Sequence, residues 1–126
     1  MNETHNFVND LVAKVPELKQ LYAEHLEDND GLLPHVFMGD LTRFVISAIA
    51  NPEELGFSRQ VASDILVRIL EMLEAGMRSE SEDVQELVAV SFLENLEPNE
   101  KYYESLKSLF GTSLAEQLKR MEDSAE

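Results

Sequence analysis

The sequence predicts an all-α fold in which about seven antiparallel helices pack around a central helix at residues 34–50. Along most of the 126-residue chain, apolar residues recur at the three- and four-residue spacing of a helix, and no segment shows the alternation of a strand. Short stretches rich in Gly, Pro, Asn and Asp separate the helical segments, so consecutive helices are expected to run antiparallel. An irregular bundle and a repeat-like α-α stack both fit this pattern. The length predicts a single domain over residues 1–126.

The segment from Leu32 to Ala50 is almost entirely apolar, with two charged residues among 19. A helix that is apolar on nearly all sides either spans a membrane or occupies the centre of a soluble core. Because charges at mid-segment are costly in a membrane, we expect a buried central helix. Pro34 suits its first turn, and Gly39 predicts the close approach of a neighbouring helix. Asp40 and Arg43 are three residues apart and share a face, where they are expected to pair.

Two shorter helices are predicted before this segment. Residues 7–15 carry apolar side chains at helical spacing, and Pro16 suits the first turn of the next helix. That helix ends in the turn sequence EDNDG, where Gly31 can take a positive φ. A calcium loop is not expected, because two positions that require carboxylates fall on Leu26 and Phe37.

Two longer helices are predicted after it. The first is capped by Ser58 and ends at Gly76, a residue type that commonly follows the last helical turn. Ser79 and Glu82 have the spacing of a capping box for the second helix, at residues 84–96. That helix has no charged residue at its centre, so it and the helix at 34–50 are expected to be the most buried.

The last two helices are amphipathic and are separated by Gly111. The preceding Pro98 and Asn99 break the chain before the first of them. Ser113 and Glu116 repeat the capping-box spacing, which predicts the start of the final helix.

The charge of the chain is strongly negative, with 25 acids against ten bases, a net charge of −15 and a pI near 4.4. Residues 1–31 hold seven acids and two bases (net −5), and residues 77–100 hold seven acids and one base (net −6). Such a surface repels nucleic-acid phosphates and anionic lipids and attracts basic proteins. We therefore expect a basic protein partner, no nucleic acid and no membrane; solubility is the alternative role for the charge.

Acidic residues in two loops form the candidate binding site. If the helices alternate in direction, the loop near residue 30 and the loop near residue 80 emerge at the same end of the molecule. The candidate partner-binding residues are Glu27, Asp28, Asp30, Glu80, Glu82 and Asp83. In the alternative interpretation, these side chains are solvated charges that cap helices and complement their dipoles.

No catalytic motif is present in the chain, which lacks a glycine-rich phosphate loop, G-x-S-x-G and H-E-x-x-H. The three histidines lack metal-ligand spacing, so no metal and no cofactor are expected. His35, Asp40 and Arg43 form a polar cluster within apolar sequence. Such clusters can be catalytic, but we interpret this one as a structural polar core that fixes helix register. We therefore predict that the protein is not an enzyme.

The compartment predicted from composition is the cytoplasm. The first ten residues, MNETHNFVND, lack the basic and apolar regions of a signal peptide. The absence of cysteine excludes disulfides and thiolate metal sites.

Two stretches, LPHVFMGDLTRFV and VQELVAVSFLENL, resemble an uncharacterised family of small acidic all-helical bacterial proteins. Some of these act as immunity proteins in toxin–immunity systems, including contact-dependent growth inhibition. The resemblance covers roughly residues 25–97; it implies an all-α fold and a cognate toxin, and it assigns no functional residue.

Two functions follow as expectations. The first is an immunity protein that binds and neutralises a basic toxin, a nuclease domain, through its acidic surface. Nucleases are basic because they bind phosphate, so an acidic inhibitor is steered toward them. The second is a small cytosolic helical scaffold or regulatory adaptor without a toxin partner.

Overall fold

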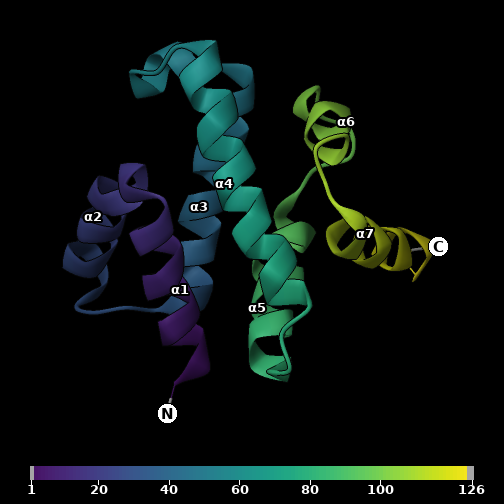
Figure 1. Cartoon of the computed structure of the whole chain (residues 1–126), viewed down its shortest axis with the longest axis horizontal. Helices are drawn as coiled ribbons and strands as arrows, with labels where there is room; N and C mark the ends of the chain where they lie inside the picture. Colours follow the sequence, from purple (N-terminus) through teal and green to yellow (C-terminus); the bar gives the residue numbers. More distant parts are fainter. Residues whose placement is uncertain (1, 125–126) are drawn as a thin grey trace.

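The computed structural model describes residues 2–124, and within them the chain forms seven α-helices and no strand (Figure 1). The helices are α1 (Glu3–Lys14), α2 (Lys19–Asn29), α3 (Pro34–Ala50), α4 (Arg59–Met77), α5 (Glu82–Ser91), α6 (Tyr102–Lys107) and α7 (Thr112–Ser124). Short 3-10 helices follow α1, α3 and α5; they are η1 (Pro16–Leu18), η2 (Pro52–Leu55) and η3 (Leu93–Asn95). The predicted all-α fold is confirmed.

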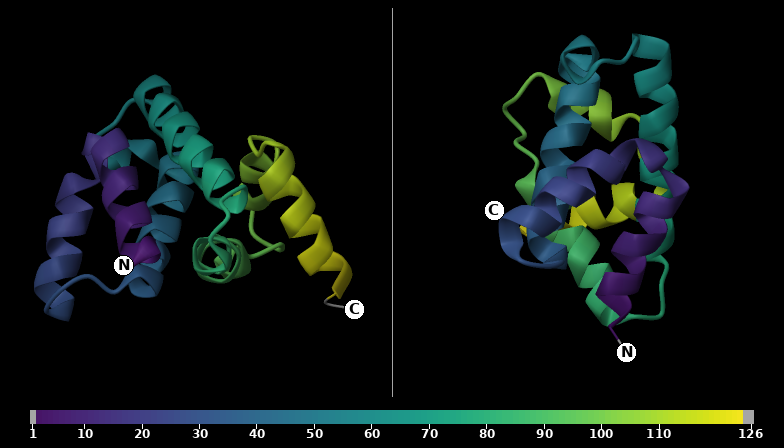
Figure 2. Two further views of the ribbon diagram at one scale, coloured as in Figure 1. Left: turned by 60° about the horizontal axis from the view of Figure 1, so that its bottom comes forward. Right: turned by 90° about the vertical axis from the view of Figure 1, so that its left-hand side faces the viewer.

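Helix α3 lies at the centre of the arrangement, in contact with α1, α2, α4, α5 and α6. The first five helices alternate in direction, whereas α7 crosses this layer at an angle and packs against α4 (Figure 1). Helices α2 and α7 lie at opposite ends of the long axis, as Figure 1 and the left part of Figure 2 show. The irregular bundle therefore describes the structure better than a regular stack of hairpins.

One hydrophobic cluster connects the helices. Phe37 of α3 and Phe92 after α5 are its largest fully buried side chains. Helix α2 contributes the partly buried Leu21 and Tyr22, and the Tyr22 ring meets Phe37 edge to face at 5.7 Å. Since about 25 cal/mol is gained per Å² of apolar surface removed from water, this cluster is the main source of stability.

Burial differs from the prediction at α3. Six of its 17 residues are buried, against eight of the 19 in α4. Its outer side exposes His35, Val36, Arg43 and Ala50. The low charge of this segment led to the wrong prediction, because Val36 and Ala50 face water although they carry no charge. The prediction for residues 84–96 is confirmed, although this segment is α5 followed by η3; its buried residues are Val84, Leu87, Val88, Ser91, Phe92, Leu93 and Leu96.

The close approach predicted at Gly39 occurs at Gly76 instead. A Cβ atom on Gly39 would meet only Nη1 of Arg43, at 3.9 Å. On Gly76 it would lie 2.9 Å from the ring of Phe7 and 3.0 Å from a methyl group of Val88. Helix α4 includes Gly76, so this glycine does not end the helix; it lets α1 and α5 pack closely against α4.

The cap of α5 is Ser81 and not the predicted Ser79. The hydroxyl of Ser81 accepts a hydrogen bond from the backbone N–H of Val84 at 3.2 Å. Ser79 Oγ instead accepts from the backbone N–H of Ser81, at 3.0 Å. Both serines lie in the polar turn before the helix, and serine is a favourable N-cap at either position. The spacing alone therefore predicted the wrong N-cap residue.

The cap of α7 comes from another helix. The buried carboxylate of Glu74 in α4 accepts hydrogen bonds from the backbone N–H groups of Ser113 at 3.0 Å and Leu114 at 3.2 Å. The exposed Arg78 pairs with the same carboxylate at 3.6 Å. Gly111 makes the approach possible, because a Cβ atom there would lie 2.8 Å from Cδ of Glu74. The predicted capping box at Ser113 is therefore wrong.

An ion pair connects η1 to α4 and gives the stability a pH dependence. Arg68 donates to both carboxylate oxygens of Glu17, at 3.0 and 2.8 Å. This hydrogen-bonded pair holds the pKa of Glu17 below its ordinary value of 4.5. A carboxyl group whose pKa is lowered on folding stabilises the fold above its unfolded pKa, and the contribution is lost as the pH falls through the folded pKa.

We expect Glu17→Gln to lower the free energy of unfolding at neutral pH by about 0.5–1 kcal/mol, the range for a partly exposed pair. The difference from wild type should be smaller at about pH 3 than at about pH 7, because the contribution is lost as the pH falls below 4.5 through the lowered pKa of folded Glu17. Urea denaturation at the two pH values measures it. The same substitution at exposed Glu116 is the control and should show no such pH-dependent difference. A loss for Glu17→Gln that is equal at both pH values would contradict the assignment.

Candidate partner-binding surface

The two acidic loops lie at the same end of the molecule. The α2–α3 connection and the α4–α5 connection are both at the lower end in Figure 1, where α1 also begins. All six predicted residues are exposed there. Glu27 and Asp28 belong to the last turn of α2, Asp30 follows it, Glu80 lies in the second loop, and Glu82 and Asp83 begin α5. We call these six residues the acidic end.

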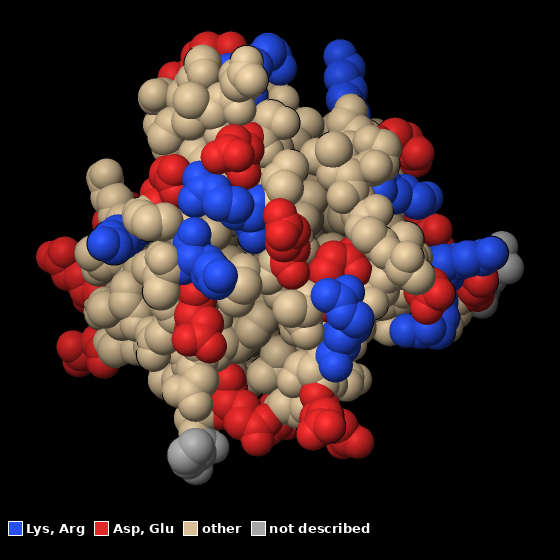
Figure 3. Space-filling model, in the orientation of Figure 1, with Lys and Arg blue, Asp and Glu red and all other residues tan. Residues whose placement is uncertain are grey.

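The carboxylates of the acidic end are not neutralised by neighbouring bases. Among residues 2–124, none of the six forms an ion pair with a Lys, Arg or His side chain. Arg78, at the start of the second loop, is held by Glu74 instead. In the face shown in Figure 3, the charged side chains along the lower edge are acidic. Negative charge at this end therefore faces solvent without compensation.

A polar hollow of about 610 Å³ extends the negative surface between the starts of α1, α3 and α5. Its lining includes Glu3, His35, Asp83 and Glu86. Glu3 and Glu86 were not among the candidate residues, although both belong to the two acidic segments of the sequence. In the part of the chain that the structure describes, no group of three or more His, Asp and Glu side chains is arranged to hold a metal ion.

The predicted polar core of His35, Asp40 and Arg43 is only partly a core. Arg43 pairs with Asp40, but the Arg43 side chain is 73% exposed. His35 is also exposed and forms a hydrogen bond with the side chain of Ser91. Only Asp40 is partly buried, with 23% of its side chain accessible. The three-residue spacing did bring Asp40 and Arg43 together, but Arg43 lies at the surface while Asp40 faces His25 of α2.

The buried histidine is His25 of α2, which the sequence places on the apolar stripe of that helix. Its side chain is fully buried, with Nδ1 3.3 Å from an Asp40 oxygen. Its Nε2 atom accepts the backbone N–H of Leu33 at 3.0 Å. Since Nε2 accepts this hydrogen bond, the tautomer with a proton on Nδ1 is the one that can donate to Asp40. His25 thus fixes the α2–α3 connection to the core, a role that periodicity alone does not reveal.

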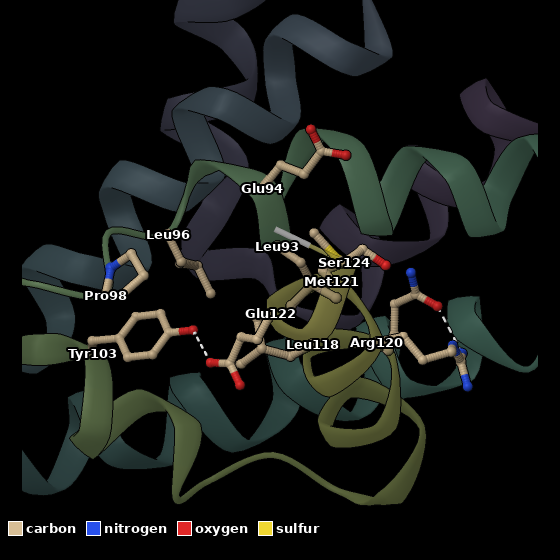
Figure 4. Close-up of a pocket in the computed structure, with 11 residues that line it drawn as sticks. Leu93, Glu94, Leu96, Pro98, Tyr103, Leu118, Arg120, Met121, Glu122 and Ser124 are labelled. Carbon is tan, nitrogen blue, oxygen red and sulfur yellow. Dashed lines mark hydrogen bonds between the residues drawn. The ribbon is translucent and has the colours of Figure 1, made fainter. Parts of the chain in front are cut away.

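A second hollow, of about 580 Å³, lies between α7 and the chain after α5 (Figure 4). Leu93, Leu96, Leu118 and Met121 give it an apolar lining. At its edge, the hydroxyl of Tyr103 donates to Glu122 at 2.7 Å. Burial, together with this bond, raises the pKa of Tyr103, and the same bond lowers the pKa of Glu122. These two polar groups satisfy each other and connect α6 to α7.

Fold and surface together define the class: a small all-α protein with exposed carboxylates at one end that form no ion pair within the described part of the chain. The chain belongs to a family described as Domain of unknown function (DUF7674), which residues 8–124 match. No curated protein and no solved structure matches the chain. No helix among the described residues has the length and apolar character needed to cross a membrane.

Proposed function

We propose that this protein is an immunity protein that binds a basic toxin, a nuclease domain, through its acidic end. The single observation that supports this most is the position of six exposed carboxylates in and beside two connections at one end of the helical bundle, where none forms an ion pair among residues 2–124. The family match itself names no activity. The proposal gives the protein no catalytic role and needs no cofactor.

The physical support is electrostatic. A nuclease active site is positively charged because it binds phosphate, and an acidic protein can occupy the same surface. Complementary charges raise association rates toward about 10⁸ M⁻¹s⁻¹ at low salt. An inhibitor that must meet its toxin in the cytoplasm before damage occurs benefits from that speed.

The test begins with the protein encoded by the reading frame directly upstream, produced with and without this chain. Growth arrest by that protein alone, and normal growth when both are produced, is the expected result. The purified pair then gives Kd and association rates. An upstream product that is not toxic, or that remains toxic beside this chain, contradicts the immunity function and favours the scaffold or adaptor.

Reversing four charges of the acidic end should weaken binding strongly. For the variant in which Asp28, Asp30, Glu82 and Asp83 are all replaced by lysine, we expect at least a hundredfold increase in Kd, mostly through slower association. The wild-type association rate should also fall steeply between about 0.1 M and about 1 M salt, as the Debye length shortens from about 10 to about 3 Å. Stopped-flow or biosensor kinetics measure both.

A matched control carries the same change in charge elsewhere. Lysine replaces four exposed acids that form no ion pair among the described residues and lie outside the acidic end; they are Glu54, Glu104, Glu116 and Asp123. Glu122 is left intact because it holds Tyr103 and Lys107. Equal weakening in the two variants would show a general effect of net charge and would contradict a defined acidic end.

A further inference from the structure

Two exposed apolar side chains stand directly beside the acidic end. Leu33 is 47% exposed and Val36 is 46% exposed. Leu33 is the N-cap of α3, and Val36 lies in the first turn of that helix. Asp28 and Asp30 lie just before them in the chain, and both are exposed and unpaired among the described residues. Single exposed apolar residues are common on protein surfaces; these two follow carboxylates that have no basic partner among the described residues.

The backbone that carries this pair is held in place from inside. The N–H of Leu33 donates to the fully buried His25, whose ring packs edge to face on Phe37 at 5.5 Å. Before it, the N–H of Gly31 donates to the carbonyl of Leu26 at 3.1 Å and closes the end of α2. A side chain displayed on an ordered backbone loses less conformational entropy when a partner covers it.

We infer that Leu33 and Val36 form the apolar anchor of the surface that receives the basic partner. This inference rests on the proposed function and specifies the chemistry of its partner: a positively charged surface that also presents an apolar side chain. Charged residues at the rim of an interface mainly control encounter, whereas covered apolar groups at its centre control dissociation. On the other side of Val36, Asp40 and Arg43 neutralise each other, so that edge neither attracts nor repels the partner.

Two synthetic peptides test the inference without the natural partner. One carries six lysines separated by serines, and the second replaces two central serines by leucine at unchanged charge. Fluorescence anisotropy gives Kd for each peptide with the wild type. The Kd values of both peptides are also measured with the double variant Leu33→Ser/Val36→Ser and with a control, Val61→Ser/Val67→Ser. The two valines of the control lie on α4 and are 45% and 47% exposed. Serine is a favourable N-cap, so the first variant is expected to fold.

The leucine peptide should bind the wild type about tenfold more tightly than the serine peptide, which corresponds to about 1.4 kcal/mol. This advantage should disappear in the Leu33/Val36 variant and persist in the Val61/Val67 control. An advantage that is absent from the wild type, or that survives in the Leu33/Val36 variant, overturns the anchor. If neither peptide binds at low salt, the acidic end does not attract basic chains, and this result contradicts both the proposed function and the anchor. Salt-sensitive binding of the serine peptide without a leucine advantage overturns the anchor alone.

Discussion

Glu74→Ala is expected to lower the free energy of unfolding by about 2–4 kcal/mol, a large part of the stability of a domain this size. The substitution removes the carboxylate that caps α7 and leaves the N–H groups of Ser113 and Leu114 without their acceptor. Loss of a helix cap costs about 0.5–2 kcal/mol, and each charge-assisted hydrogen bond contributes about 1.5–3 kcal/mol. Urea denaturation followed by circular dichroism measures the change.

Two further variants separate the cap from the packing. Glu74→Gln keeps one acceptor oxygen and loses the charge, so its cost should be roughly half that of Glu74→Ala. Glu71→Ala, on an exposed position of the same helix, should change stability by less than about 0.5 kcal/mol. A Glu74→Ala protein as stable as the Glu71→Ala control would show that α7 does not depend on this carboxylate.

The same contact predicts coupling between two positions that are far apart in the chain. Gly111→Ala alone should destabilise the protein, because its Cβ would lie 2.8 Å from Cδ of Glu74. In the Glu74→Ala background this obstacle is gone, so Gly111→Ala should cost little. A double-mutant cycle is therefore expected to give a coupling energy of about 1–2 kcal/mol.

Periodicity predicted the helices and their order, but not the groups that bridge them. Helical spacing and turn residues located the helices, and alternation in direction placed the two acidic loops at one end. The cap of α7 was not predictable in this way, since Glu74 lies 39 residues before Ser113 and nothing local distinguishes it from other acids of α4. The structural role of His25 was missed for a similar reason, because its acceptor and donor partners lie on a following loop and helix.

The candidate surface was predictable to the extent that it depends on local charge. Glu3 and Glu86 join it only through the three-dimensional meeting of α1, α3 and α5. Arg43 was assigned to the core because apolar residues surround it in sequence, yet a helix in contact with five others still presents one side to water. A charge count along the chain therefore locates an acidic end, whereas the pairing of each charge requires the structure.

Gly76→Ala and Gly39→Ala are expected to change stability in opposite directions. Both glycines lie inside helices, where alanine gains about 1 kcal/mol over glycine when space allows. At Gly39 the nearest atom to a Cβ is Nη1 of the exposed, flexible Arg43, at 3.9 Å, so we expect a gain of about 0.5–1 kcal/mol. At Gly76 the Cβ would meet Phe7 at 2.9 Å and Val88 at 3.0 Å.

The contact at Val88 decides the sign for Gly76. Its side chain is fully buried and cannot move without displacing the core, and overpacking of this kind costs about 1–3 kcal/mol. We therefore expect a net loss of about 1–2 kcal/mol for Gly76→Ala, accompanied by shifted methyl signals of Val88 in the NMR spectrum. Val88→Ala opens the space that the new methyl group needs. Adding Gly76→Ala to the Val88→Ala protein should therefore cost less stability than adding it to the wild type. A stabilising Gly76→Ala would mean that α1 and α5 do not press against α4 at this position.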